Sequence, residues 1–289
     1  MQISEHVHAV KIPFDLRNRA GEKVIDRFVY VFLIYGQRIY LIDTGVAFSE
    51  QLTFDYIRKT GRRPDEMSKI MVTHSHPDHI GALKAIKELI ACPVIAHGAE
   101  RDWIENIDKQ FAERPIANFY TLMGGSVQVD ETIDEGDVIR LDDDDSLNLR
   151  VFHTPGHSRG SSSYYLEADK VLVVGDAIPV PGDLPIYDDP WTSVESIKKL
   201  MRVREANTLL SSWAEPIFGD KVRTAMEQGA NYIKRLHELV VEIVNDDPLI
   251  DTVAMCQRVL ESVNIPAKMA LPLVVRSLAA SLPHKDRVF

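Results

Sequence analysis

The stretch His74-Ser75-His76-Pro77-Asp78-His79 decides how this chain of 289 residues is interpreted. It directly follows the apolar run Ile70-Met71-Val72-Thr73, which is typical of a short buried strand. It directly precedes a segment with helical periodicity that starts near Ile80. Pro77 suits the first turn of a helix, where the missing N–H of proline costs nothing. The stretch is therefore predicted to be a turn between a strand and a helix.

Three imidazoles and one carboxylate crowd this turn, and such groups are costly to bury unless they have partners. His74 and His76 are two residues apart on an extended segment, so their side chains project to the same side. Asp78 and His79 come from the turn itself and can face a second point close by. Neutral imidazole and carboxylate suit zinc, and also iron or manganese. A solvated polar turn is the alternative interpretation, which the strand–turn–helix context disfavours.

The rest of the chain alternates between strand-like and helix-like segments. Strands are predicted over residues 7–14, 28–35, 38–43, 69–73, 93–96, 127–129, 138–141, 147–152, 162–166, 171–174 and 208–212. Helices are predicted over residues 49–60, 80–90 and 194–204, and in pieces over residues 99–122, with a proline-rich loop over residues 179–190. After Gly219 only helical patterns remain, over residues 222–245, 249–263 and 271–282. We therefore expect an α/β domain over residues 1–218 and a helical extension over residues 219–289.

Charge and composition narrow the class of protein. The formal net charge is −10, and such a surface would repel phosphate backbones and anionic lipid, so nucleic acid is not an expected partner. No apolar run approaches the ~18–20 residues of a membrane span, and the first residues lack the pattern of a secretory signal. Two cysteines, Cys92 and Cys256, cannot form a disulfide framework. We expect a cytoplasmic protein without a membrane span.

The histidine-rich stretch resembles the HxHxDH signature of the metallo-β-lactamase fold superfamily, and three further motifs occur in the family's order. Leu41-Ile42-Asp43-Thr44-Gly45 is similar to its early strand that ends in Asp-Thr-Gly. His153-Thr154-Pro155-Gly156-His157 is similar to its HTPGH segment, and Val173-Val174-Gly175-Asp176 to its strand that ends in Gly-Asp. The resemblance covers about residues 1–218 and implies a four-layer αββα sandwich. The helical extension is similar to those of glyoxalase II-type thioesterases and quinolone-signal response proteins, and it favours a small-molecule substrate in a covered pocket.

The resemblance also implies roles for single residues. His74, His76 and His157 would hold a first metal ion. Asp78 and His79 would belong to a second ion, with Asp176 between the two. Asp43 would orient ligands near the site, and His97 and His153 are expected beside the ligands in an orienting or structural role. Candidates for substrate contacts are Tyr187, Trp191 and Trp213, although Tyr187 and Trp191 would equally serve to pack their loop onto the core.

One departure from the family's pattern concerns the second metal. The family usually supplies a last histidine from a segment after the next strand, where this chain has Trp213 or Ala214. An indole N–H is a donor only and cannot ligate a metal. Glu215 is a candidate surrogate because it carries an oxygen donor two residues on; otherwise the second site is weak or empty. The resemblance thus implies one or two zinc ions, with iron or manganese as alternatives.

These features predict a metal-dependent hydrolase. A bound metal lowers the pKa of its water from 15.7 toward ~7, so a metal-bound hydroxide would attack an ester, thioester or lactone. Asp78 would orient the water and later pass a proton to the leaving group. The alternatives are a phosphodiesterase, which two metals would suit, and a metal-binding sensor or effector with little turnover. A homodimer is common for such folds.

Overall fold

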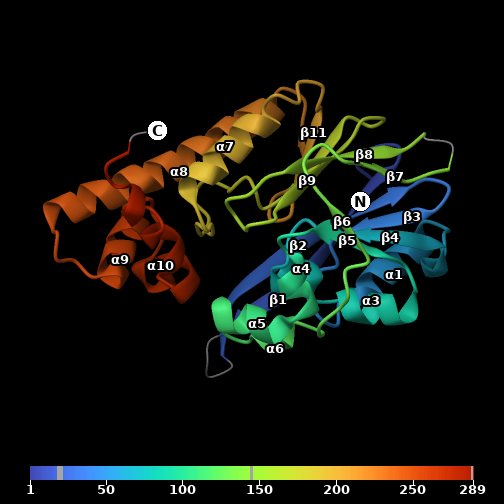
Figure 1. The fold of residues 1–289 in the computed structure, drawn as a ribbon, viewed down its shortest axis with the longest axis horizontal. Coiled ribbons are helices and arrows are strands. Elements are labelled where there is room, and N and C mark those ends of the chain that lie inside the picture. Colours follow the sequence, from blue (N-terminus) through green and yellow to red (C-terminus); the bar gives the residue numbers. More distant parts are fainter. Residues whose placement is uncertain (18–21, 144–145, 288) are drawn as a thin grey trace.

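The computed structural model describes residues 1–17, 22–143, 146–287 and 289, and within them two six-stranded sheets lie face to face (Figure 1). The first sheet has the order β1-β2-β3-β4-β5-β6, formed by Val7–Arg17, Lys23–Tyr35, Ile39–Ile42, Met67–Met71, Val94–His97 and Glu131–Ile133. The second has the order β12-β11-β10-β9-β8-β7; in chain order, β7 to β12 are Val138–Arg140, Asn148–His153, Ser162–Leu166, Val171–Gly175, Thr208–Ser211 and Ile217–Phe218.

Helices cover the outer face of each sheet (Figure 1). The first sheet is covered by six helices, α1 to α6; in chain order they are Glu50–Lys59, Pro77–Ile80, Leu83–Leu89, Arg101–Glu105, Ile107–Glu113 and Phe119–Leu122. The 3-10 turn η1 (Pro64–Glu66) lies between α1 and β4 in the chain. The second is covered by α7 (Pro190–Leu200) and the first half of α8 (Lys221–Asp246). The predicted four-layer αββα sandwich is therefore confirmed.

The sequence of β2 shows why the sheets are buried on both faces. Successive side chains of a strand point to opposite faces. Val31 and Leu33 pack against the outer helices, whereas Phe32 and Ile34 pack against the second sheet. A strand that is covered on both sides reads as a continuous apolar run, as residues 28–35 do.

The parallel parts of the two sheets position the chemistry-bearing residues. Strands β3, β4 and β5 run parallel to one another, so their carboxyl ends meet at one edge of the first sheet. Asp43 follows β3, and His74 follows β4. In the second sheet β10 and β11 are also parallel, and Asp176 and Trp213 follow them. Residues distant in sequence are thereby brought to the same edge of the sandwich.

The second half of α8 lies outside the sandwich and packs with α9 (Thr252–Ser262), α10 (Pro272–Ala279) and the 3-10 turns η2 (Ala267–Met269) and η3 (Leu282–His284). The loop before α7 joins this cluster through the buried Tyr187. The expected C-terminal helices are thus present, and the domain boundary at residue 218 stays a prediction. Among the described residues, no helix combines the length and apolar character needed to cross a bilayer.

Several predicted elements differ from the structure in their bounds, and two of the differences have a local explanation. Residues 127–129 form no strand, and the sixth strand of the first sheet lies at Glu131–Ile133 instead. Val127 and Val129 are buried with Gln128 exposed between them, so the segment has the alternation of a strand while packing against helices. Helix α7 begins four residues earlier than residue 194, because the Asp189 carboxylate accepts the Thr192 N–H and Pro190 occupies the first turn.

Candidate metal centre

The histidine-rich stretch lies where β4 ends and α2 begins, as predicted. The His76 carbonyl accepts the N–H groups of His79 and Ile80, which turns the chain sharply into the helix. Pro77 is the first helical residue. His74, His76 and His79 are all buried, although each is a polar side chain. Their burial requires partners from other elements.

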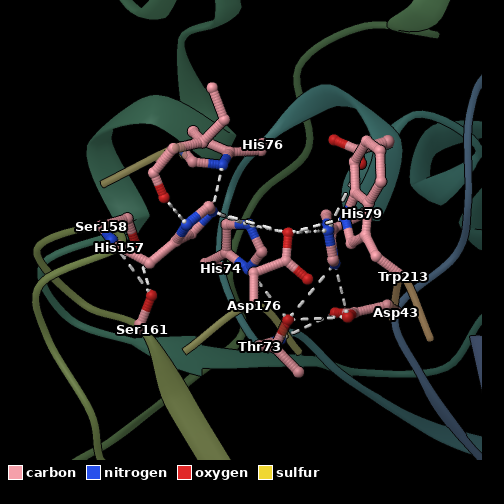
Figure 2. Close-up of polar contacts among 12 residues, drawn as sticks. Asp43, Thr73, His74, His76, His79, His157, Ser158, Ser161, Asp176 and Trp213 are labelled. Atoms are coloured by element: carbon pink, nitrogen blue, oxygen red, sulfur yellow. Dashed lines mark hydrogen bonds and ion pairs between the residues drawn. The ribbon is translucent and has the colours of Figure 1, made fainter. Parts of the chain in front are cut away.

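One group of three imidazoles converges at this turn (Figure 2). His157, from the loop after β8, places its Nε2 atom 3.2 Å from Nε2 of His74 and 2.9 Å from Nδ1 of His76. The structure therefore brings together the three residues that were expected to share a metal ion.

Hydrogen bonds on the far side of the rings fix which nitrogens carry lone pairs. Nδ1 of His157 donates to the Ile186 carbonyl at 2.7 Å, so its Nε2 is an acceptor. The Thr73 hydroxyl donates to Asp43 at 2.7 Å and therefore accepts from Nδ1 of His74 at 3.0 Å, so Nε2 of His74 is also an acceptor. Two lone pairs thus face each other at 3.2 Å, and a cation between them would turn this repulsion into attraction.

A second group forms around Asp176 (Figure 2). Nδ1 of His79 donates to Asp43 Oδ2 at 2.8 Å, and its Nε2 lies 3.2 Å from Asp176 Oδ2. Asp78 Oδ2 lies 3.6 Å from the same Nε2 atom. Asp43 also accepts the Thr73 N–H at 2.7 Å, so this carboxylate anchors the turn as well as orienting His79. Asp43 thus lies beside the cluster, and its orienting role stays a prediction.

Two buried carboxylate oxygens of the second group have no hydrogen-bond partner among the described residues: Asp78 Oδ2 and Asp176 Oδ1. Buried polar groups are nearly always paired, so such atoms require an explanation. Nitrogen and carboxylate oxygen donors in this arrangement fit a divalent metal ion. The residues present therefore fit the metal that the sequence implies.

Burial and charge shift the proton affinities of the two groups in opposite directions. Burial lowers the pKa of His74 and His76 well below the usual value, and it lowers that of His157. Burial opposes the charged form of His79 too, but the carboxylates of Asp176, Asp78 and Asp43 outweigh it and raise its pKa well above the usual value. The three converging imidazoles are thereby kept neutral, which is the form that binds a metal.

Asp78 and Asp176 also differ in their proton affinity. Burial is the main reason that the pKa of the Asp78 carboxyl is raised. Burial acts in the same sense on Asp176, but the neighbouring His79, His157 and Trp213 hold its pKa below the usual value. The two carboxyl groups beside His79 therefore differ in their affinity for a proton.

Glu100, which no sequence motif indicates, connects the loop of His74 and His76 with the loop of His157. It is only 2% exposed, and its Oε2 atom accepts the Ser75 N–H at 3.0 Å and the Ser75 hydroxyl. Its Oε1 atom accepts the Ser158 hydroxyl and the Gly160 N–H, both at 2.6 Å. Ser75 lies between His74 and His76, and Ser158 follows His157, so one carboxylate ties both loops together.

Helix α5 supports the same turn from another side. Gln110 is buried and donates from Nε2 to the Ser75 carbonyl at 2.6 Å. Arg114, one turn further along, is 5% exposed, and burial lowers its pKa to about 10. Its positive charge also lowers the pKa of His74 and His76, which favours the neutral imidazoles. Neither residue carried a signal in the sequence that linked it to the turn.

Glu215 is the expected ligand that the structure directs elsewhere. Its carboxylate is 61% exposed and contacts Lys11 Nζ at 2.8 Å and the Tyr30 hydroxyl at 2.7 Å. These partners on β1 and β2 draw the side chain away from the cluster, because an ion pair and a hydrogen bond satisfy both of its oxygens. The expectation that Glu215 replaces a ligand is therefore corrected.

His97 and His153 form a stacked pair next to the metal-binding loops, with ring centroids 4.0 Å apart. Nδ1 of His97 accepts the Ala99 N–H at 3.1 Å, and Nε2 of His153 donates to the Arg159 carbonyl at 2.9 Å. His97 also lies against Gly160, where an added Cβ would approach its Nδ1 to 2.9 Å. The pair therefore packs under the loop that follows His157, and its orienting role stays a prediction.

The three aromatic candidates for substrate contacts occupy different places. Tyr187 is 3% exposed and lies in the cluster formed with α8, α9 and α10. Trp191 stacks on Phe289 at 3.9 Å. Only Trp213 reaches the metal centre, where its Nε1–H donates to Asp176 Oδ2 at 2.8 Å (Figure 2). The structure thus favours the packing alternative for Tyr187 and Trp191.

Comparisons with known proteins agree with this geometry. A hydroxyacylglutathione hydrolase of Mesorhizobium japonicum is 30% identical over 154 residues, which are 53% of this chain and 49% of that protein. A probable metallo-hydrolase of Bacillus subtilis is 33% identical over 128 residues, which are 43% of this chain and 54% of that protein. The chain spans about half the length of the curated relatives it matches.

Solved structures show the same fold over nearly the whole chain. A metallo-beta-lactamase family protein of Thermus thermophilus superposes with a TM-score of 0.75 at 18% identity, covering 96% of this chain and 92% of that one. A beta-lactamase domain protein of Burkholderia ambifaria superposes with a TM-score of 0.73 at 17% identity, covering 98% of this chain and 86% of that one. The family model of the metallo-beta-lactamase superfamily matches residues 24–213. The chain belongs to the metallo-beta-lactamase superfamily.

Proposed function

We propose that the chain is a metal-dependent hydrolase that cleaves an ester, thioester or lactone in a small-molecule substrate. The observation that carries the proposal is the convergence of His74, His76 and His157. Nε2 of His157 lies 3.2 Å from Nε2 of His74 and 2.9 Å from Nδ1 of His76. A divalent metal ion held by these nitrogens supplies Lewis acidity and lowers the pKa of water toward neutrality. Three imidazoles favour zinc, and iron or manganese are the alternatives.

Asp78 is the acid–base group of this proposal. Its side chain is 14% exposed, whereas those of Asp176 and His79 are 9% and 0% exposed. Its Oδ2 atom has no hydrogen-bond partner among the described residues. The raised pKa brings this carboxyl closer to the range in which it both accepts and returns a proton. Asp78 orients the attacking water and passes its proton to the leaving group.

The relatives of the chain support a thioester as the substrate. One relative is named for hydrolysis of hydroxyacylglutathione, a thioester, but the chain covers only 49% of it. A thioester is the first substrate to test, followed by an activated ester and a lactone. Two free, buried cysteines fit a reducing compartment, which supports the proposed cytoplasmic location.

The test compares the native chain with His76→Ala on an acyl-glutathione thioester, p-nitrophenyl acetate, a lactone and bis-p-nitrophenyl phosphate. His6→Ala is the matched control, because this histidine pairs with Asp169 outside the metal centre. We expect turnover of at least one carbonyl substrate, lost in His76→Ala and retained in His6→Ala. Turnover of the phosphodiester alone would replace the proposal with a phosphodiesterase. No turnover by metal-loaded protein would favour a sensor or effector.

A further inference from the structure

Trp213 is held firmly against the second group of the metal centre. The residue follows β11, and its indole Nε1–H donates to Asp176 Oδ2 at 2.8 Å (Figure 2). The Cζ atom of Arg27 lies 4.6 Å from the centroid of the indole, and the Phe14 ring packs edge-to-face with it, with ring centroids 6.2 Å apart. Arg27 is itself fixed by two hydrogen bonds to Asp183, of 2.7 and 3.0 Å. The indole N–H is therefore aimed at the carboxylate by its surroundings.

The oxygen that accepts this hydrogen bond is the one that lies between the two groups. Asp176 Oδ2 is 3.2 Å from Nε2 of His79, and 3.6 and 3.8 Å from the Nε2 atoms of His157 and His74. A carboxylate oxygen has two lone-pair sites, both in the plane of the carboxylate. An oxygen that bridges two cations uses both sites, and the indole N–H already occupies one site of Asp176 Oδ2. Asp176 Oδ2 is thus left with the capacity for one cation.

We infer that Trp213 limits this centre to one tightly held metal ion, bound by His74, His76 and His157, and leaves the side formed by His79 and Asp78 weak. The inference rests on the proposed metal-dependent function. A cation on the weak side would contact Asp78 and His79, which lie 3.6 Å apart, and the unpartnered Oδ1 atom of Asp176. The indole beside them contributes no ligand, and its N–H withdraws charge from the shared carboxylate.

The experiment measures metal binding rather than turnover. Chelator-stripped protein is titrated with zinc against a chromophoric competitor, and elemental analysis gives the zinc retained after dialysis. We expect about one zinc per native chain. Trp213→Phe, which keeps a smaller aromatic ring but removes the N–H donor, should tighten the binding of a second zinc at least ~10-fold, the scale on which hydrogen-bond partners of ligands act. Trp213→His places an imidazole beside Asp176 and should retain about two zinc ions per chain.

Trp103→His is the matched control. The Trp103 indole N–H also donates to a carboxylate, that of Glu113, at 2.8 Å, but on the exposed surface of α4 and α5. This variant should retain one zinc. Two tightly bound zinc ions in the native chain, or a second zinc no tighter in Trp213→Phe, would overturn the inference. A native chain that binds no zinc, iron or manganese would instead overturn the proposed function, so the two failures are distinguishable. If Trp213→His does not fold, Trp213→Phe decides alone.

Discussion

Replacing Glu100 with Gln tests whether the two ligand-bearing loops are held by one carboxylate. Four donors converge on Glu100: the N–H and hydroxyl of Ser75, the Ser158 hydroxyl and the Gly160 N–H. An amide of the same shape replaces one acceptor oxygen with an NH2 group. Whichever oxygen is replaced, one backbone N–H then faces a donor and cannot rotate away. The remaining hydrogen bonds lose the help of the negative charge.

The magnitude follows from these four contacts. Hydrogen bonds to charged groups contribute about 1.5–3 kcal/mol each, and an unsatisfied buried donor costs about 1–3 kcal/mol. The variant loses one contact and weakens three, so we expect its free energy of unfolding to fall by roughly 3–6 kcal/mol. This is a large share of the ~5–15 kcal/mol by which a domain is stable. Because the loops carry His74, His76 and His157, we also expect metal affinity to fall by about 10–100-fold.

Asp169→Asn is the matched control for this prediction. The side chain of Asp169 is also only 2% exposed, and it accepts hydrogen bonds from Ser4, from the His6 N–H at 2.9 Å and from the His6 ring at 2.6 Å. It lies before β10, at the opposite end of that strand from Asp176. Urea unfolding should show both variants destabilised, while a competitive zinc titration should show weaker binding only for Glu100→Gln. Equal zinc affinities in the two variants would refute the positioning role of Glu100.

Two further predictions concern the loop and acid stability. Ser277→Ala removes the hydroxyl that accepts the Tyr187 N–H at 2.9 Å, and the neighbouring Ile186 carbonyl accepts the hydrogen bond that orients His157. This variant should therefore lower the free energy of urea unfolding by about 1–3 kcal/mol and weaken zinc binding, whereas Ser262→Ala on the exposed face of α9 should change neither. Metal-free protein should lose stability as the pH falls below about 6.5, because the pKa values of His74, His76 and His157 are lowered in the folded state and the unfolded chain takes up protons first. His79 has a raised folded-state pKa and so opposes this loss, but it is one imidazole against three. Urea unfolding at each pH measures the effect, and a flat stability profile between about pH 7.5 and 5 would contradict the neutral state of the three imidazoles.

Local pattern was enough to predict the turn that carries the histidines. An apolar strand, a proline at the start of a helix and polar residues between them lie within ten residues of sequence. The resemblance added Asp43, His157 and Asp176, and the structure brings all three to the same edge of the sandwich. Parallel strands explain this convergence, because their carboxyl ends meet at one edge of a sheet.

Long-range partners could not be predicted in the same way. Glu100 caps no helix with its side chain, and nothing in its neighbourhood shows that its carboxylate is buried under Ser75 and Ser158. Glu215 was expected near the metal from its position alone, but its carboxylate accepts hydrogen bonds from Lys11 and Tyr30 on neighbouring strands instead. Which acidic residue is buried and which is paired at the surface depends on tertiary neighbours that sequence spacing does not reveal.

The most direct test of metal-dependent hydrolysis is the turnover of an acyl-glutathione thioester by chelator-stripped protein as zinc is added back. We expect no turnover in the stripped protein and recovery in proportion to the zinc bound, with His76→Ala recovering none. Full turnover in protein shown by elemental analysis to be metal-free would contradict a metal-dependent reaction. Zinc binding by the native chain without turnover of the thioester, an activated ester or a lactone would contradict it equally.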